Sequence, residues 1–353
     1  MESTILSKDE AIAKLLAKIE SVKIPDALKE KVQEMFSQLS INSHSEQTFW
    51  QNYQIATAYI DWIIKIPWFT QTQDILDINH ASEKLNENHY GLDSVKERLL
   101  EYVSVLALQK SRNPDNPMKA PVLLFVGLVG TGKTTMAKSI AEVMGRELIR
   151  IPFGGLGDPL YLRGRSRVYP EAEPGQIIKG LVNCKSKNPV ILLDEIDRVA
   201  DDALNTIMGV LVELLDPEQN NKFTDHYIDY PVDLSGALFC ATCNNTARIA
   251  TAVMDRLEVI QMPSYTDEEK MVIGRDYIFP KAIKEAGLNK DELQIAPNVW
   301  AQVVRPLGFD AGVRTLQRNI EGLCRKSAKL ILEGKMKQIV VDDSNIKEFL
   351  PQW

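Results

Sequence analysis

The sequence has no apolar run long enough to cross a membrane and no sign of export. Its apolar stretches, such as residues 121–126, fall far short of the about 20 residues that a membrane-spanning helix requires. No basic segment precedes an apolar core near Met1, as it would in a secretory signal. We therefore expect a cytoplasmic protein that has no membrane partner.

Cysteine is also scarce, with Cys184, Cys240, Cys243 and Cys324 as the four that the chain contains. Without an export signal, they predict reduced thiols rather than a disulfide framework. Cys240 and Cys243 form a C-x-x-C pair, but no second Cys or His pair is present to complete four zinc ligands. Because this pair lies in an apolar, strand-like run, we interpret both residues as buried thiols.

An excess of positive charge is absent as well. The 41 Lys and Arg residues are outnumbered by 48 Asp and Glu residues, which gives a net charge of -7. This balance argues against a general basic surface for nucleic acid and leaves room only for local basic patches. The hydrophobic content of 44% and the charged content of 25% are typical of globular proteins. A length of 353 residues predicts two or three packed units.

The order of apolar patterns predicts three parts of the chain. Residues 1–70 show the 3.6-residue period of helices and form an N-terminal helical subdomain. Residues 71–262 alternate short apolar runs with helical patterns, which favours a largely parallel sheet flanked by helices. Within this part, residues 113–117 read Asn-Pro-Asp-Asn-Pro and are expected to form a linker after a helix. Residues 263–353 predict a small, mainly helical domain.

The most specific motif is a phosphate-binding loop of the form G-x-x-x-x-G-K-[ST] between a predicted strand and a predicted helix. It consists of Gly127, Leu128, Val129, Gly130, Thr131, Gly132, Lys133 and Thr134. Its glycines leave room for backbone N–H groups to converge on phosphates, and the helix N-terminus adds a favourable dipole. We expect Lys133 to reach the β- and γ-phosphates of ATP, and Thr134 to coordinate Mg²⁺.

Further candidate residues follow two other apolar runs. Asp194 and Glu195 end one run, where the carboxyl edge of a parallel sheet would bring them to the phosphates. Asp194 is expected to hold Mg²⁺ through water, and Glu195 to polarise the attacking water. Asn244 follows the next run and is either a sensor of the γ-phosphate or a turn former. Arg256 is either an ion-pair partner or an arginine supplied to the nucleotide of a neighbouring subunit.

Together these motifs resemble the AAA+ module of the Lon family of ATP-dependent proteases, from about residue 24 to about residue 334. Beyond the phosphate loop and the acidic pair, the segments that carry the resemblance are Trp62–Trp68, His89–Leu92, Asp216–Asn220, Phe223–Tyr227 and Ala311–Arg314. The resemblance implies an α/β P-loop AAA+ domain with an N-terminal helical subdomain and a C-terminal small, mainly helical domain. It also implies a homohexameric ring that binds ATP or ADP with Mg²⁺.

The resemblance assigns roles to single residues. It implies that Asn244 is the sensor-1 asparagine, Arg256 an arginine finger that acts across the subunit interface, and Arg314 the sensor-2 arginine. These three would form the catalytic set with Lys133 and Glu195. A second group falls where the family surrounds adenine, and it consists of Tyr90, Leu92 and Tyr277.

Tyr169 and Pro170 match the aromatic pore-loop position of the family. An aromatic side chain on a loop that lines a ring axis can grip an unfolded chain of any sequence, because apolar contact is non-directional. The alternative is that Tyr169 packs under its own loop. Two departures from the family are visible: Pro170 and Glu171 replace an apolar residue and a glycine, and Leu128 and Val129 replace a double proline.

The leading hypothesis is a ring motor that hydrolyses ATP to unfold and translocate unfolded or tagged polypeptides. Lon proteins carry a Ser-Lys peptidase domain, and the sequence stops at Trp353, about where that domain would begin. We therefore expect no peptide hydrolysis from these residues. One alternative is a nucleic-acid-remodelling ATPase, in which Arg163, Arg165 and Arg167 hold a strand beside Tyr169. Another is a nucleotide-bound scaffold that does not hydrolyse ATP.

Overall fold

The computed structural model describes residues 7–42, 45–113, 120–305 and 310–350, so most of the expected linker at 113–117 lies outside the described residues. The helices are α1 (Lys8–Glu20), α2 (Asp26–Asn42), α3 (Glu46–Ile63), α4 (Ile78–Asn88), α5 (Asp93–Arg112), α6 (Lys133–Met144), α7 (Leu160–Arg163), α8 (Gln176–Cys184), α9 (Leu204–Leu215), α10 (Thr251–Met254), α11 (Asp267–Val272), α12 (Phe279–Glu285), α13 (Trp300–Val304), α14 (Arg314–Leu332) and α15 (Ile346–Phe349). The strands are β1 (Val122–Val126), β2 (Leu148–Pro152), β3 (Val190–Asp194), β4 (Phe223–Thr224), β5 (Pro231–Val232), β6 (Leu238–Cys243), β7 (Leu257–Gln261), β8 (Leu293–Ile295) and β9 (Ile339–Val341).

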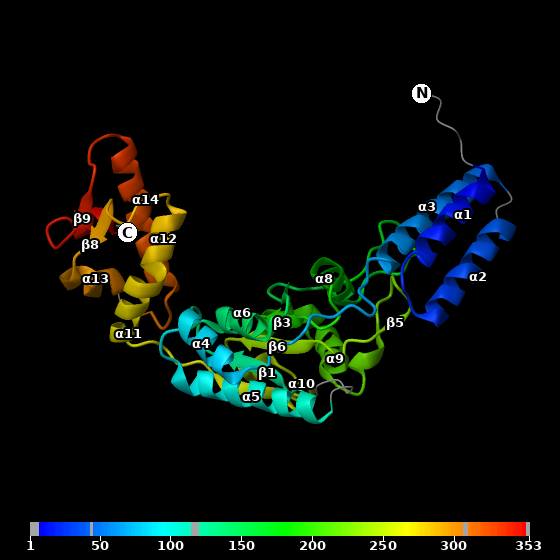
Figure 1. Ribbon diagram of the computed structural model, residues 1–353, viewed down its shortest axis with the longest axis horizontal. Coiled ribbons are helices and arrows are strands. Elements are labelled where there is room, and N and C mark those ends of the chain that lie inside the picture. The colour runs from blue at the N-terminus through cyan, green and yellow to red at the C-terminus, as the bar shows by residue number, and fades with distance from the viewer. Residues whose placement is uncertain (1–6, 43–44, 114–119, 306–309, 351–353) are drawn as a thin grey trace.

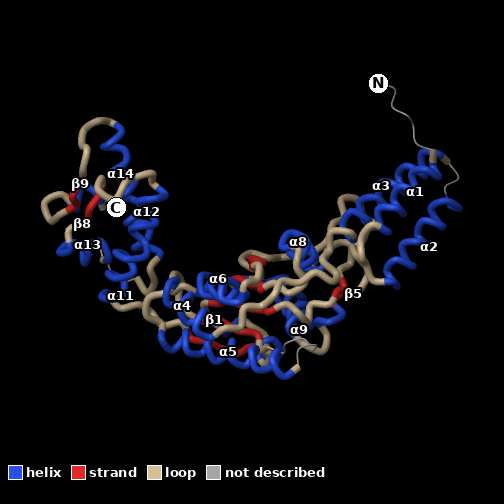
Figure 2. Tube along the Cα trace, viewed as in Figure 1, coloured by secondary structure: helices blue, strands red, loops and turns tan. Residues whose placement is uncertain are grey.

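A five-stranded parallel sheet forms the centre of the molecule, with the strand order β2-β3-β6-β1-β7. Figure 2 shows these strands grouped in the middle of the chain between helices. The chain crosses between strands through helices, as parallel pairing requires. The carboxyl ends of β3, β6 and β1 therefore meet at one edge, where the phosphate loop and the acidic pair also lie.

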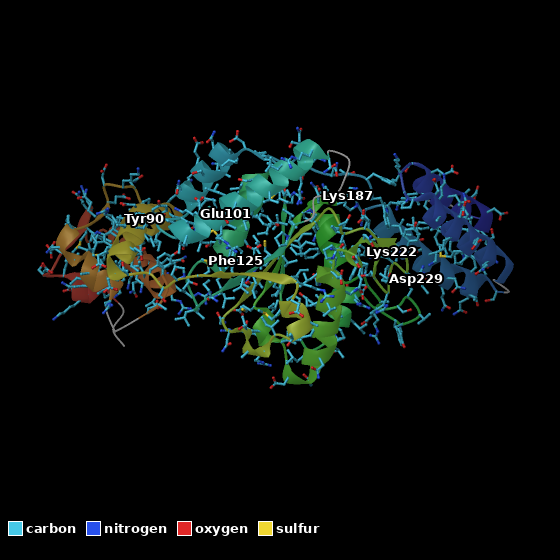
Figure 3. The ribbon with its side chains drawn as sticks, turned by 90° about the horizontal axis from the view of Figure 1, so that it is seen from below. Tyr90, Glu101, Phe125, Lys187, Lys222 and Asp229 are labelled. Carbon is cyan, nitrogen blue, oxygen red and sulfur yellow. The ribbon has the colours of Figure 1, made fainter. Side chains whose placement is uncertain are left out.

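The strands are apolar throughout because both faces of the sheet are covered. Leu123 and Phe125 pack in one cluster with α4, α5 and α6, and Phe125 lies deep in the central part of Figure 3. Leu124 and Val126 point the other way, into a cluster with α8 and α9. Alternate residues of a strand face opposite sides, so a strand buried on both sides needs a continuous apolar run. The predicted parallel sheet flanked by helices is confirmed.

The N-terminal part is a three-helix bundle of α1, α2 and α3, which extends from one end of the molecule in Figure 1. Its apolar periodicity places Phe49, Ala56, Ile60 and Ile63 on one buried face of α3. These side chains belong to the same apolar cluster as α8 and α9 of the central part. The bundle therefore packs directly on the sheet-containing part of the chain.

The C-terminal part, which we call the lid, lies at the opposite end in Figure 1 and contains α11–α15 with the two strands β8 and β9. It has its own apolar core, which includes Trp300, Leu316 and Ile320. At the start of α11, the Thr266 hydroxyl accepts a hydrogen bond from the N–H of Glu269, and the Glu269 carboxylate accepts one from the N–H of Thr266, as the capping-box spacing predicts.

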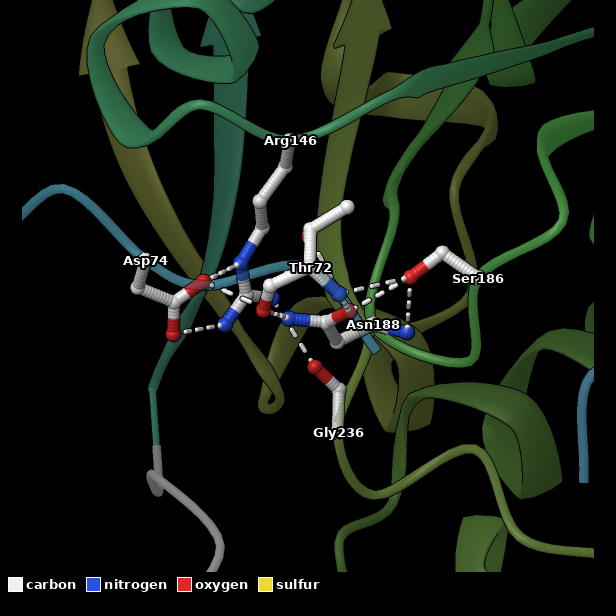
Figure 4. Close-up of polar contacts among 6 residues, drawn as sticks. All are labelled: Thr72, Asp74, Arg146, Ser186, Asn188 and Gly236. Carbon is white, nitrogen blue, oxygen red and sulfur yellow. Dashed lines mark hydrogen bonds and ion pairs between the residues drawn. The ribbon is translucent and has the colours of Figure 1, made fainter. Parts of the chain in front are cut away.

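The segment between the bundle and α4 is fastened to the sheet by a buried polar network (Figure 4). The Arg146 guanidinium donates to both carboxylate oxygens of Asp74, at 2.7 and 2.8 Å, and to the Gly236 carbonyl at 2.8 Å. The Asn188 side chain accepts from the N–H of Thr72 at 2.8 Å and donates to its carbonyl oxygen at 3.0 Å. The backbone N–H and carbonyl of Thr72, which is partly buried, are thus both paired by the Asn188 side chain.

The structure also shows the state of the cysteines and the character of the helices. Cys240 and Cys243 are buried free thiols, as interpreted from the sequence. Among the described residues, no helix has the length and apolar character needed to cross a membrane.

Candidate nucleotide-binding site

The phosphate loop joins the end of β1 to the start of α6. Gly127 is packed so closely that an added Cβ would lie 2.8 Å from the Met262 carbonyl oxygen. Gly130 and Gly132 have φ values of 83° and 92°, which side-chain-bearing residues rarely adopt. Glycine at these positions lets the loop follow this path, and a loop of this kind before a helix N-terminus is suited to binding anions.

Lys133 begins α6 and is almost fully buried. Its ammonium group donates to the carbonyl oxygens of Gly127 at 2.7 Å and Leu128 at 2.9 Å, and to Oδ1 of Asn244 at 3.0 Å. Burial is the main cause that lowers the pKa of Lys133. The contact joins the phosphate loop to the residue that follows β6, and it brings the side chain of Asn244 into the same cavity as Thr134 and Asp194.

Asp194 ends β3 beside the hydroxyl of Thr134. Its Oδ1 accepts from Thr134 Oγ1 at 3.2 Å and from Thr242 Oγ1 at 2.6 Å, and its Oδ2 accepts from Arg150 Nε at 2.8 Å. Sequence reasoning missed Thr242 and Arg150, because neither belongs to a motif. The next residue, Glu195, has a φ of 60°, and its N–H donates to Thr242 Oγ1 at 2.9 Å. A single hydroxyl therefore fixes both acidic residues.

The oxygens of Thr134 and Asp194 fit an octahedral cation. Mg²⁺ prefers oxygen ligands, and the Thr134 hydroxyl and the Asp194 carboxylate lie 3.2 Å apart, so the hydroxyl would bind the ion directly and the carboxylate would hold it through water. No group of three or more His, Cys, Asp or Glu in the described part of the chain could hold a metal by itself. Phosphate oxygens and water would have to complete the shell, which is how proteins usually bind Mg²⁺ with nucleotides.

A second cavity, of about 250 Å³, adjoins the phosphate loop and extends to the lid. Tyr90 and Tyr277 line it, with ring centroids 6.4 Å apart, and Figure 3 places Tyr90 at the lid end of the molecule. His89, also in the lining, contacts Ser139 Oγ through Nε2 at 2.9 Å, and burial lowers its pKa to about 4. Leu92 does not line this cavity: its side chain is buried in the apolar cluster that also contains Leu85 and Val95. The aromatic walls suit a flat heterocycle.

The lid reaches the phosphate loop through the segment before α14. The N–H of Val313 donates to the Gly130 carbonyl at 3.0 Å, and Gly312 touches the backbone of Val129 and Gly130. Arg314, the first residue of α14, lines the same cavity as Lys133 and Asp194. The predicted phosphate-loop, acidic, Asn244 and Arg314 residues are thus brought together. The direct contact of Gly312 with the loop was not foreseen.

Arg256 lies apart from these residues, after α10. Its guanidinium donates to Asp216 Oδ2 at 2.8 Å and to the Ala252 carbonyl at 2.7 Å, and it does not line either cavity described above. Tyr169 lies on the loop between α7 and α8 with 52% of its surface exposed. The Arg165 guanidinium stacks 4.7 Å from its ring centroid. Tyr169 therefore does not pack under its own loop.

Comparison with known families agrees with this arrangement. Residues 123–265 match the family described as the ATPase family associated with various cellular activities (AAA). The fold and the site therefore define an AAA ATPase domain. Residues 284–340, in the lid, match the Lon protease AAA+ ATPase lid domain.

Similar curated proteins extend this match to most of the chain. The chain is 42% identical over 337 residues to Lon protease 1 of Bacillus subtilis, which covers 95% of the chain and 42% of that protein. It is 40% identical over 341 residues to the Lon protease of Dictyoglomus thermophilum, covering 96% of the chain and 42% of the relative. The resemblance to the AAA+ ATPase module of the Lon family is confirmed. The chain spans about two fifths of the length of these relatives.

Proposed function

We propose that this chain is an ATP-hydrolysing motor module that unfolds and translocates polypeptides within a homohexameric ring. The observation that supports it is the convergence of Lys133, Thr134 and Asp194 on one cavity, with Glu195 beside them. In this proposal, residues 1–70 form a helical subdomain, residues 71–262 the nucleotide-binding domain and residues 263–353 the lid. Peptide-bond hydrolysis is not assigned to these residues.

Each residue of the cavity is proposed to have a separate role in binding or hydrolysing ATP. Backbone N–H groups of the loop and the Lys133 ammonium bind the phosphates, and Asn244, which accepts from that ammonium, is placed to contact the γ-phosphate. Mg²⁺ held by Thr134 and Asp194 would neutralise charge on the phosphate oxygens. Glu195, which follows Asp194 at the carboxyl edge of the sheet, orients the attacking water. The Tyr90 and Tyr277 rings hold the adenine.

Arg256 is proposed to act on the nucleotide of a neighbouring subunit. It lines neither cavity of its own chain, and Asp216 holds its guanidinium in place. An arginine supplied in trans is worth about 10³ to 10⁵ in turnover, because it stabilises charge that develops in the transition state. Hydrolysis would then depend on ring assembly. Arg314 at the start of α14 would connect phosphate occupancy to the position of the lid.

Polypeptide is favoured over nucleic acid as the substrate. Of the three arginines that could hold a nucleic-acid strand, Arg163 pairs with Glu213, and Arg167 stacks on Tyr59. The net charge of -7 also opposes a general attraction to phosphate backbones. The exposed Val168 and Tyr169 instead offer apolar surface to an extended chain, with 83% and 52% of their surfaces accessible.

Three substitutions test the proposed site through nucleotide binding and steady-state turnover. Lys133→Ala should abolish nucleotide binding, and Glu195→Gln should keep binding but lose ATP turnover. Arg256→Ala should also keep binding and lose turnover, because the arginine is missing from the nucleotide site of the neighbouring subunit. Arg248→Ala is the matched control, since Arg248 pairs with the exposed Asp201. A Lys133→Ala protein that binds ATP normally would show that the phosphate site is wrong.

The mechanism of Arg256 has its own test. Mixed rings of Arg256→Ala and Glu195→Gln subunits should regain turnover, because some interfaces then combine an intact arginine with an intact glutamate. Failure of the mixture to hydrolyse ATP, with rings shown to exchange subunits, contradicts action in trans. Absent turnover in assembled wild-type rings supports the non-hydrolysing scaffold instead.

A further inference from the structure

The loop that carries Tyr169 closes on itself at a narrow base. An added Cβ on Gly175 would lie 2.0 Å from the Leu162 carbonyl oxygen, and one on Gly164 would lie 2.8 Å from the N–H nitrogen of Gly175. The fully buried Asp225 holds this base, since its Oδ2 accepts from the N–H of Gly175 at 2.7 Å. The loop of residues 164–175 is therefore anchored at its base, while Tyr169 stays exposed.

The segment of residues 225–229, which holds the base of the loop, also contacts the N-terminal bundle. Asp225 Oδ1 accepts from the N–H of Ile228 at 3.1 Å, and the carbonyl of Ile228 accepts from the hydroxyl of Tyr59 in α3 at 2.9 Å. One residue later, the Asp229 carboxylate pairs with Lys31 of α2 at 2.6 Å. Figure 3 shows Asp229 beside the bundle, at the end of the molecule opposite Tyr90. Residues 225–229 thus contact both the loop base and two bundle helices.

Arg167 connects the Tyr169 loop directly to the N-terminal bundle. Its guanidinium carbon lies 3.7 Å from the ring centroid of Tyr59, and its Nη2 lies 3.8 Å from Asp229 Oδ2. Tyr59 is almost fully buried, so this cation and ring meet where water is largely excluded, which strengthens their attraction. Arg167 is only two residues from Tyr169. The bundle therefore holds one side of the loop next to its exposed aromatic residue.

We propose that Arg167 is a positioning residue through which the N-terminal bundle sets the orientation of the Tyr169 loop. A shift of α3 would move the Tyr59 ring, and with it Arg167 and the exposed aromatic side chain. An incoming polypeptide that contacts the bundle could thus be presented to a loop already in position to grip it. The part of this inference that concerns polypeptide rests on the proposed function, whereas the coupling of bundle and loop does not.

Hydrogen exchange of the 353-residue chain tests the coupling without any substrate. Arg167→Ala should speed exchange of loop amides such as that of Arg165, which donates to the Glu173 carbonyl, by about five- to tenfold. Tyr59→Phe, which loses only its bond to Ile228, should also speed exchange in the loop although it lies in the bundle. Lys8→Ala is the control, because Lys8 lies 5.2 Å from the Phe49 ring in the same bundle. Loop exchange equal to wild type in Arg167→Ala overturns the proposal, whatever Tyr59→Phe shows.

Stimulation of ATP turnover by a permanently unfolded model protein tests the consequence. Arg167→Ala should raise the half-saturating polypeptide concentration about five- to tenfold and leave basal turnover unchanged. In Arg167→Lys this concentration should lie between those of Arg167→Ala and the wild type, since an ammonium also binds a ring face. Unchanged half-saturation in Arg167→Ala contradicts the positioning role. If the wild-type protein itself shows no stimulation, the proposed function fails, and the exchange experiment still decides the coupling.

Discussion

The contact between Gly312 and the phosphate loop gives the sharpest prediction about the site. An alanine Cβ at position 312 would lie 2.4 Å from the Gly130 carbonyl carbon, and 2.5 Å from the carbonyl oxygens of Gly130 and Val129. Carbon atoms in contact are normally about 3.5 to 4.0 Å apart, so the lid would have to withdraw by roughly 1 Å. This movement stretches the 3.0 Å hydrogen bond between the Val313 N–H and the Gly130 carbonyl.

We expect Gly312→Ala to impair catalysis more than it impairs binding. The weakened hydrogen bond is worth about 1 kcal/mol, or about a fivefold loss of nucleotide affinity. Arg314, which we propose as a catalytic residue, lies two residues away and moves with the lid, and a misplacement of about 1 Å at a catalytic group can lower turnover about 10²-fold. The fold itself should survive, because the lid has its own apolar core.

Calorimetric titration with a non-hydrolysable ATP analogue and steady-state ATP turnover measure the two effects separately. Gly209→Ala is the matched control: Gly209 lies exposed in α9, and an added Cβ there meets no atom within 4 Å. That alanine should leave turnover unchanged and stabilise the helix by up to about 1 kcal/mol. If Gly312→Ala turns over ATP at the wild-type rate, the lid does not act through this contact and the reasoning fails.

Three further predictions concern the buried network, a histidine and a hydroxyl. Arg146→Met should lower the free energy of unfolding in urea by about 3 kcal/mol, because it leaves the largely buried Asp74 carboxylate without its charge partner; a loss below about 1 kcal/mol contradicts this. His89 stays neutral down to a pKa of about 4 in the folded protein, whereas its ordinary value is 6.5, so the unfolded state binds more protons between these values. Stability should therefore fall by up to about 3 kcal/mol as pH drops from 6.5 to 4, and His89→Gln should remove this part of the slope; parallel pH profiles of the two proteins argue against it. Thr242→Val can neither donate to Asp194 nor accept from the Glu195 N–H, and should lower turnover more than about tenfold while keeping nucleotide binding.

The phosphate loop and the sheet could be predicted from the sequence for a local reason. A strand buried on both faces must be apolar at every position, as in residues 122–126 and 190–193, and the structure confirms both strands. The positive φ values of Gly130 and Gly132 are likewise a local requirement that glycine satisfies. Because Asp194 ends its strand, the topology of a parallel sheet was enough to place it at the phosphate edge.

Other features depend on partners that are distant in the chain and carry no local signal. Nothing near Thr242 indicates that its hydroxyl holds Asp194, and nothing near Gly312 indicates contact with Gly130, since these pairs meet only after the sheet and the lid have packed. The same applies to Arg167 and Tyr59, which belong to different parts of the molecule.

The amino-acid sequence by itself determined the phosphate loop, the alternation of short apolar strands with helices and the burial of Cys240 and Cys243, because each follows from the pattern of a few neighbouring residues. Only the tertiary structure decided which hydroxyl orients the acidic pair, that Leu92 is buried in an apolar cluster instead of lining the aromatic cavity, and which helix supports the loop of Tyr169. Those contacts arise from the packing of whole elements against one another, and their geometry is set by the shapes of surfaces that the chain assembles from widely separated residues.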